Sequence, residues 1–518
     1  MTAGLQEERP GLFAKTGKIM GNNIFSYFII FLASGLFTCT RNGISYKNSN
    51  ITVEEIKSNI EYLASDELMG REPGHPGIEK AANYITEKFK SYGVKIIPAT
   101  SSYFQKIKFE KAAPPHEASL SFLNSDFRQN ENLIQIAGPS LTKNLEFVYL
   151  DYAATAEEYA GISLKNKILI TKLGGPGLTG RSIFNFSDEK NILAQQNGAL
   201  ALIEIPANTF DWNGLASYFG HTRTILSNPE SKGSEIPHFY LSDPEEKITE
   251  KLKNNSDGAI RIDTPGFASD SFYSSNIMGF IPGTNPEKSD EFIVLCAHYD
   301  HIGAGLHKRG ASVADSIFNG ARDNGMGVVA LLAAAKHLAQ NPAQRPVLVL
   351  ALTAEESGLQ GSRFFTTNSP ILLKNIVFAL NNDGAGMTDD KIATLVGFEK
   401  TTAKEAIRQG VKQAGLLAAS DPVPHMNLFE RSDNISFAKL GIPATTMSPG
   451  FHQFSGALSE KYHKVNDEVD ADFSIDYLHK YSLAYAFAAQ AIANMDNKPE
   501  WVDGEKYQAA ASELYKND

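Results

Sequence analysis

The sequence contains few cysteines and no basic stripe. Cys39 and Cys296 are the two cysteines among 518 residues, so no disulfide framework is possible if Cys39 is removed or modified. The net charge is −11, and no row of Lys and Arg is available to neutralise phosphates. Nucleic acid is therefore not an expected partner. The composition, 42% hydrophobic and 21% charged, is typical of a globular protein, and the length favours two domains.

One apolar run near the N-terminus predicts export. Residues 24–37 are almost wholly apolar but too few to span a bilayer comfortably, which favours a signal peptide over residues 1–39. The run ends in Leu36-Phe37-Thr38-Cys39, which resembles a bacterial lipobox. Two outcomes stay open, lipidation of Cys39 with membrane attachment or ordinary cleavage near Thr40. The mature protein is accordingly expected to be a cell envelope lipoprotein, or a secreted or periplasmic protein.

The pattern of apolar residues divides the remaining chain. Residues 119–264 combine short β-rich runs with Gly-rich loops, which indicates an inserted β-rich domain. Residues 40–118 and 265–505 are interpreted as the two parts of the main domain, because strands and helices alternate in the second part. The predicted helices are 53–63, 77–92, 326–338 and 473–495, and the predicted buried strands are 292–297, 347–353, 376–382 and 442–447.

Acidic and imidazole side chains follow three of these strands at the points where the strands end. His298 and Asp300 come directly after the first strand, the pair Glu355-Glu356 follows the second, and Asp383 follows the third. Parallel strands present such positions to a crevice at the carboxyl edge of their sheet. Each residue alone has an ordinary explanation in a turn or at a strand end. Together they predict one site, in which Asp300 can orient the imidazole of His298.

Two residues from loops complete a set of metal ligands. Asp323 precedes the apolar helix and is the best candidate for a bridging carboxylate, although alone it would be interpreted as a helix N-cap. His463 would alone be interpreted as a loop histidine. Two His and three carboxylates suit two Zn²⁺ ions that share one ligand, and one further carboxylate is left to handle a proton. Beside His463, Tyr462 is expected either to donate to a developing oxyanion or to pack as an aromatic.

These motifs, in this order, resemble the co-catalytic dizinc aminopeptidases, a family that includes relatives of aminopeptidase Y, glutamate carboxypeptidase II and the transferrin receptor. The resemblance covers roughly residues 53–495. It implies an α/β zinc-peptidase fold with a mixed, mostly parallel central sheet flanked by helices. It also implies that the insert is a protease-associated domain. The matching motifs are Ala297-His298-Tyr299-Asp300, Gly320-Ala321-Arg322-Asp323-Asn324, Ala354-Glu355-Glu356, Asn382-Asp383 and Tyr462-His463.

The resemblance also implies roles for the individual residues. Two zinc ions per chain are expected. His298 and Asp383 would bind one zinc, and Glu356 and His463 would bind the other. Asp323 would bind both ions.

The same resemblance makes Glu355 the expected general base. One departure from the family lies nearby: where the family often has Arg-Ser-Asp-His, this chain has Arg431-Ser432-Asp433-Asn434. The amide of Asn434 replaces an imidazole. No metal ligand is lost, but the hydrogen bonding of the pocket is expected to differ. Arg431 is kept and is expected to contact substrate.

The expected function is that of a metallo-aminopeptidase acting on peptides with a free N-terminus. Three alternatives remain open. A carboxypeptidase of the same family would need cationic groups for the substrate carboxylate, which the sequence does not place. A glutaminyl-cyclase-like enzyme would use one zinc, whereas a complete five-ligand set is present. A non-enzymatic receptor would be expected to have lost ligands or the base.

Overall fold

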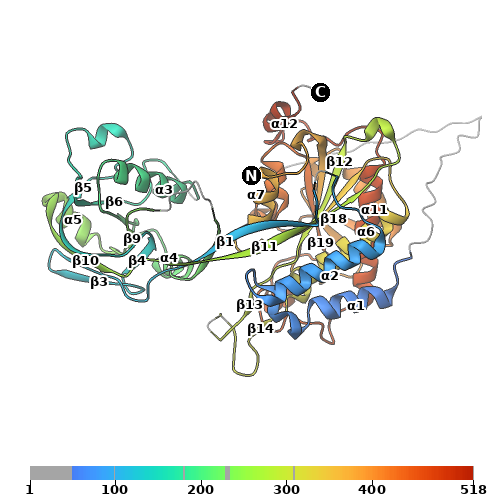
Figure 1. Cartoon of the computed structure of the whole chain (residues 1–518), viewed down its shortest axis with the longest axis horizontal. Helices are drawn as coiled ribbons and strands as arrows, with labels where there is room; N and C mark the ends of the chain where they lie inside the picture. The colour runs from blue at the N-terminus through green and yellow to red at the C-terminus, as the bar shows by residue number, and fades with distance from the viewer. Residues whose placement is uncertain are drawn as a thin grey trace, which may run out of the picture. The chain divides into compact units, whose positions relative to one another are not determined.

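The computed structural model describes residues 50–98, 100–178, 181–227, 234–306, 308 and 310–516 (Figure 1). The chain divides into Met1–Asn48 and Ser49–Asp518, and the described residues belong to the second unit. The predicted signal peptide and Cys39 lie outside the described residues. Among the residues described, no helix has the length and apolar character needed to cross a membrane.

A nine-stranded mixed sheet forms the centre of the main domain. The parallel pairs join β19 to β16, β16 to β12, β12 to β15 and β17 to β18, and the remaining pairs are antiparallel. The predicted strand at 376–382 is confirmed without change. In sheet order the strands are β18 (Leu417–Ser420), β17 (Ile392–Val396), β19 (Ala444–Pro449), β16 (Ile376–Asn382), β12 (Phe292–His298), β15 (Val347–Leu352), β11 (Ala268–Ile281), β1 (Phe104–Ala113) and β8 (Arg223–Leu226).

Helices cover both faces of this sheet. Alternate residues of a strand point to opposite faces, so Leu295 packs with one layer of helices and Cys296 with the other. Figure 1 shows α1 and α2, in blue, beside α6 of the first layer. The first layer contains α1 (Val53–Leu63), α2 (Pro76–Tyr92), α6 (Met326–Gln340), α8 (Lys404–Gln413) and α11 (Ile475–Ala493), and the second contains α7 (Gln360–Thr367), α9 (Asn434–Ala438) and α12 (Gln508–Leu514).

The start and end of α2 follow from local chemistry. Pro76 occupies its first turn, where a missing N–H costs little, and Gly93 ends it in the left-handed conformation at φ 82°. Gly77 allows close packing, because a Cβ there would lie 1.8 Å from the carbonyl oxygen of Leu68. The start of α2 is thereby packed closely against the segment that contains Leu68.

The insert is built on an eight-stranded sheet whose strands lie between Ser119 and Thr264. One strand from this part of the sequence, β8, pairs with β1 of the main sheet instead. The boundaries 119 and 264 stay a prediction. In sheet order the strands are β3 (Ser125–Arg128), β2 (Ser119–Phe122), β10 (Asp257–Thr264), β5 (Leu141–Tyr149), β6 (Lys167–Lys172), β7 (Ala201–Ile205), β9 (His238–Leu241) and β4 (Leu133–Ala137), with helices α3 (Arg181–Gln196), α4 (Trp212–Phe219) and α5 (Lys247–Asn254).

Two short elements complete the main domain. A two-stranded hairpin joins Gly303–Ala304 to Ile317–Phe318 (β13 and β14). The helix α10, Ala457–Lys461, precedes Tyr462 and His463. The hairpin comes after β12 and α10 comes after β19, so both lie in the loops that follow central strands.

Candidate metal centre

The carboxyl ends of three parallel central strands meet at one cavity. His298 ends β12, Glu355 and Glu356 follow β15, and Asp383 follows β16. All four line a cavity of about 100 Å³ together with Asp323. The side chains at the ends of the parallel strands therefore lie together at one edge of the sheet, as the sequence predicts.

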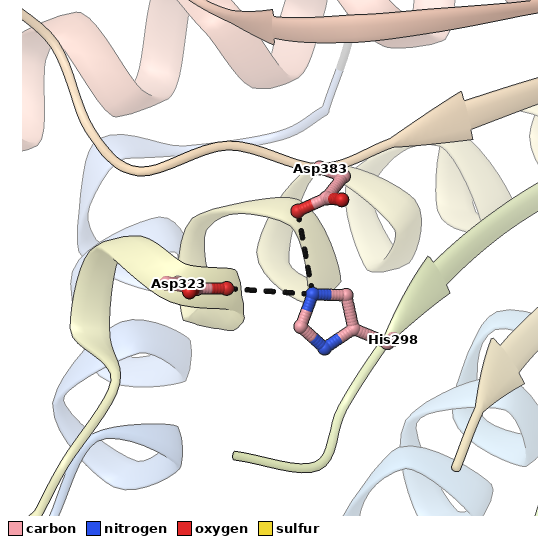
Figure 2. A group of neighbouring side chains, drawn as sticks. All are labelled: His298, Asp323 and Asp383. Carbon is pink, nitrogen blue, oxygen red and sulfur yellow. Dashed lines mark hydrogen bonds and ion pairs between the residues drawn. The ribbon is translucent and has the colours of Figure 1, made fainter. Parts of the chain in front are cut away.

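A first ligand group surrounds the imidazole of His298. Its Nε2 lies 3.3 Å from Oδ1 of Asp383 and 3.4 Å from Oδ1 of Asp323, as Figure 2 shows. One ligand atom from each of these three residues lies within 4.8 Å of the others. The spacing is compatible with one metal ion between them.

A second group surrounds His463, on the other side of Asp323. The Nε2 of His463 lies 3.1 Å from Oδ2 of Asp323 and 3.1 Å from Oε2 of Glu356. Asp323 therefore turns one oxygen toward each group, the arrangement required of a bridging carboxylate. The roles of the five residues as ligands stay predictions, and the structure brings all five together.

The backbone of Asp323 is held by a residue that sequence reasoning missed. The carboxylate of Asp467 accepts hydrogen bonds from the backbone N–H groups of Arg322 (3.0 Å) and Asp323 (3.1 Å). It also forms an ion pair with the guanidinium of Arg322 at 3.2 Å. Asp467 is fully buried, but in the sequence it is one acidic residue in a polar loop. No local pattern distinguishes it.

Asp300 positions the two glutamates as well as the imidazole. Its carboxylate accepts hydrogen bonds from the backbone N–H groups of Glu355 (3.1 Å) and Glu356 (3.3 Å). The Nδ1 of His298 lies 3.8 Å from the same carboxylate and 3.3 Å from the carbonyl oxygen of Asp300. Burial raises the pKa of Asp300 to about 7. Asp300 thus joins the loop after β12 to the loop after β15.

His301 is a second residue that the sequence analysis missed. Its Nδ1 lies 2.8 Å from Oε1 of Glu356, and its ring is buried. His301, Asp323 and Glu356 also form a group with ligand-like spacing. His301 lies three residues after His298, and this proximity was the available signal. A single histidine in a loop, however, carries no pattern of its own.

The pKa values of the two adjacent glutamates shift in opposite directions. Burial raises the pKa of Glu355 well above its usual range, and the charges of Asp383 and Glu356 add to this effect. Burial acts in the same direction on Glu356, but His463 and His301 outweigh it and lower its pKa to about 2. Glu356 is therefore the ionised carboxylate of the pair, whereas Glu355 binds a proton readily.

Asp323 is also held in its ionised form. Burial acts to raise its pKa, but the imidazoles of His298 and His463 beside its two oxygens outweigh burial and lower it. Although Nε2 of His463 lies close to two carboxylates, it is buried and forms no hydrogen bond of acceptable geometry with any described residue. Buried imidazole and carboxylate donors that converge without saturating one another suit a zinc ion.

Tyr462 and Arg431 both line the same cavity. The ring of Tyr462 stacks on His463 with centroids 3.8 Å apart, and burial raises its pKa. Its hydroxyl therefore stays protonated and able to donate. Arg431 is exposed at the cavity, where its guanidinium can reach a bound molecule.

The departure at Asn434 has a structural explanation. Its side-chain amide donates to the carbonyl oxygen of Phe429 at 2.9 Å, and its amide oxygen accepts from the hydroxyl of Thr446 at 2.9 Å. Thr446 lines the cavity. Asn434 thus fixes the cavity wall from behind and does not enter the cavity lining itself.

Part of the chain matches a known family of peptidases. Residues 276–487 match the model of Peptidase family M28. This range contains all the predicted ligands, Glu355 and Tyr462, so the family resemblance predicted from the sequence is confirmed there. The chain is also similar to the vacuolar membrane proteases of Saccharomyces cerevisiae strain YJM789 (32% identity over 142 residues) and Kluyveromyces lactis (29% over 150 residues). The matches cover 27% and 28% of this chain but 13% and 15% of those relatives.

Among solved structures, the chain is similar to an aminopeptidase from Aneurinibacillus sp. strain AM-1. The sequence identity is 21% and the TM-score is 0.56, with 84% of this chain and 93% of that chain covered. The likeness confirms the predicted α/β fold with a mixed sheet flanked by helices.

Proposed function

We propose that the protein is a zinc-dependent aminopeptidase that hydrolyses peptides from a free N-terminus. One observation carries the proposal: the two ligand groups meet at Asp323, and an additional carboxylate, Glu355, lines the same small cavity as His298, Asp323, Glu356 and Asp383. His298 and Asp383 would hold one zinc, His463 and Glu356 the other, and Asp323 both. The match to Peptidase family M28 supports a peptide substrate.

The chemistry divides between the metals and the side chains of the chain. Zinc bound at these sites supplies Lewis-acid polarisation of a carbonyl and acidifies a water molecule. Glu355 takes the proton from the attacking water and passes it to the departing amine, and its raised pKa suits both transfers. Asp300 holds the loop that carries Glu355. The hydroxyl of Tyr462 can donate to the oxygen that becomes negatively charged.

The shape of the cavity favours removal of one residue at a time. Its volume of about 100 Å³ and its partly apolar wall suit one side chain of the substrate. The carboxylates that line it can pair with the ammonium group of a free N-terminus. The apolar lining residues are Val396, Leu428, Phe451, Phe454 and Leu458.

The direct test is hydrolysis by the zinc-loaded protein of three matched substrates. A leucine anilide and a peptide with an amidated C-terminus should both be cut, whereas the N-acetylated form of the same peptide should be a poor substrate. Hydrolysis of the acetylated peptide with failure on the amidated one would instead favour a carboxypeptidase. Full activity with one bound metal would favour the cyclase-like alternative.

We also propose that residues 1–39 export the chain and that Cys39 is lipidated. The support is the apolar run at 24–37 and the lipobox-like sequence that ends at Cys39. Acyl chains add about 0.8 kcal/mol per buried CH₂, so two or three chains hold a folded domain on a membrane. Cys39→Ala should move the protein to the soluble fraction with unchanged turnover. A mature N-terminus beyond Cys39 would contradict lipidation.

A further inference from the structure

A second cavity lies against the ligand cluster, and Glu355 does not line it. It has a volume of about 600 Å³, and Glu356, His463 and His301 form part of its wall. Glu356 lines both cavities, whereas Glu355 and Tyr462 line the smaller one. The second ligand group therefore separates a small apolar cavity from a larger one.

The insert forms part of the wall of the larger cavity. The cavity is also lined by Tyr218 of α4 and by the residues from Thr222 to Ile225, which include most of β8. The strand β8 is at the edge of the main sheet and pairs with β1. The side-chain amide of Gln360 donates to the carbonyl oxygen of Thr224 and to that of Ser357 (2.9 Å). This contact attaches β8 to the loop that carries Glu355 and Glu356.

Two side chains of this wall are unusually exposed for their type. Tyr218 is 68% exposed and Ile225 is 42% exposed. Both line the larger cavity. An exposed aromatic and an exposed aliphatic side chain beside a catalytic cluster offer apolar surface to a bound molecule.

We propose that the larger cavity binds the departing part of the peptide, and that Tyr218 and Ile225 of the insert are specificity-determining residues for it. The inference rests on the proposed function. An enzyme that releases one residue at a time needs a small pocket for that residue and a larger space for a chain of variable length. The two cavities differ in this way, with volumes of about 100 and 600 Å³, and Glu356 of the ligand group lines both. Glu355 faces the small cavity, so the bond that is cut lies at the boundary.

The substrate class follows from this placement. Peptides of several residues contact Tyr218 and Ile225, whereas a leucine anilide ends in a single ring and does not extend along the wall. The insert therefore selects for extended peptides over dipeptide-sized substrates. Because the contacts come from apolar side chains, they favour apolar residues in the second and third positions of the peptide.

The test compares KM for a leucine anilide with KM for a pentapeptide that begins with Leu and has apolar second and third residues. The variants are Tyr218→Ala, Ile225→Ala and the double variant. The double variant should raise KM for the pentapeptide about tenfold, equivalent to about 1.4 kcal/mol. Its kcat and KM for the anilide should stay unchanged, because neither residue lies in the smaller cavity.

Tyr273→Ala is the matched control, since Tyr273 is 50% exposed and lines neither of these two cavities. It should behave as the unaltered protein on both substrates. Equal effects of the double variant on anilide and pentapeptide, or no effect on either, would overturn the inference while leaving the proposed function intact. An unaltered, zinc-loaded protein that cuts neither substrate would overturn both.

Discussion

The insert and the main domain each bury a cluster of charged side chains, and the two clusters differ in charge balance. In the insert, Nζ of Lys190 lies 2.6 Å from Oε1 of Glu204, and Nε2 of His238 lies 2.9 Å from Oε2 of the same residue. Ser187 also donates to Glu204 and lies 3.1 Å from the hydroxyl of Tyr240. Every charge here has a protein partner, and the residues are almost completely buried.

The main-domain cluster has an excess of carboxylates and lines a cavity. Five acidic residues face three histidines, and neither of the two imidazole Nε2 atoms of His301 and His463 forms a hydrogen bond with a described residue. Buried charges that lack hydrogen-bond or ion-pair partners raise the free energy of the folded state unless a cation binds between them. Similar residue types thus form a saturated structural cluster in one place and the proposed metal centre in the other. The residues of the main-domain cluster are Asp300, Asp323, Glu355, Glu356, Asp383, His298, His301 and His463.

Removal of metal should have the largest effect. Dialysis against a chelator should abolish activity, and about two zinc ions per chain should restore it, because the predicted ligands converge around His298 and around His463. Metal analysis should show loss of zinc in Asp323→Asn and full zinc in Lys190→Met. Zinc lost from Lys190→Met instead would show that the insert cluster also binds metal.

Replacement of the base should have the next largest effect. Glu355→Gln should lower kcat by about two orders of magnitude or more while both metals stay bound, since the general base contributes on that scale. Steady-state kinetics and metal analysis on the same sample measure both quantities. A near-normal kcat would remove Glu355 from the proposed role.

The insert cluster should respond in stability and not in metal content. Lys190→Met leaves Glu204 buried without its cation, so the free energy of unfolding should fall by about 3–5 kcal/mol. Denaturant unfolding measures the loss. Lys172→Met is the matched control, because its pair with Asp151 at 2.6 Å is partly exposed and should be worth less than about 1 kcal/mol. Equal losses of unfolding free energy in the two variants would contradict the larger contribution expected from the buried ion pair.

The smallest effect is expected for Ser187→Ala, which tests whether the cluster in the insert is a hydrolase site. Ser187, His238 and Glu204 resemble a nucleophile, a base and an orienting acid in composition, but all three are buried. Ser187→Ala removes a hydrogen bond and should cost about 1–3 kcal/mol of stability because an acceptor is left buried. Turnover should be unchanged in an assay below the unfolding temperature. A large loss of turnover would assign catalysis to the insert.

Much of the fold could be predicted because the apolar pattern is periodic. The helix at Val53–Leu63 and the strand at Ile376–Asn382 have the predicted bounds. The strand predicted at 442–447 lies two residues later, at Ala444–Pro449. The apolar run begins before the first residue that pairs with a neighbouring strand. Apolar residues indicate burial, whereas the bounds of a strand depend on its hydrogen bonds to its neighbours.

The sequence by itself determined the set of ligand-type residues, because all except His463 follow a buried strand or precede a helix, and all five occur in an order typical of one family. The tertiary structure alone decided which atoms meet: the two oxygens of Asp323 facing different histidines, Asp467 holding its backbone, and His301 contacting Glu356. It also decided that β8 leaves the insert for the main sheet. These contacts join residues far apart in the chain, and no local pattern records them, since hydrogen bonds and burial depend on where the folded backbone places each atom.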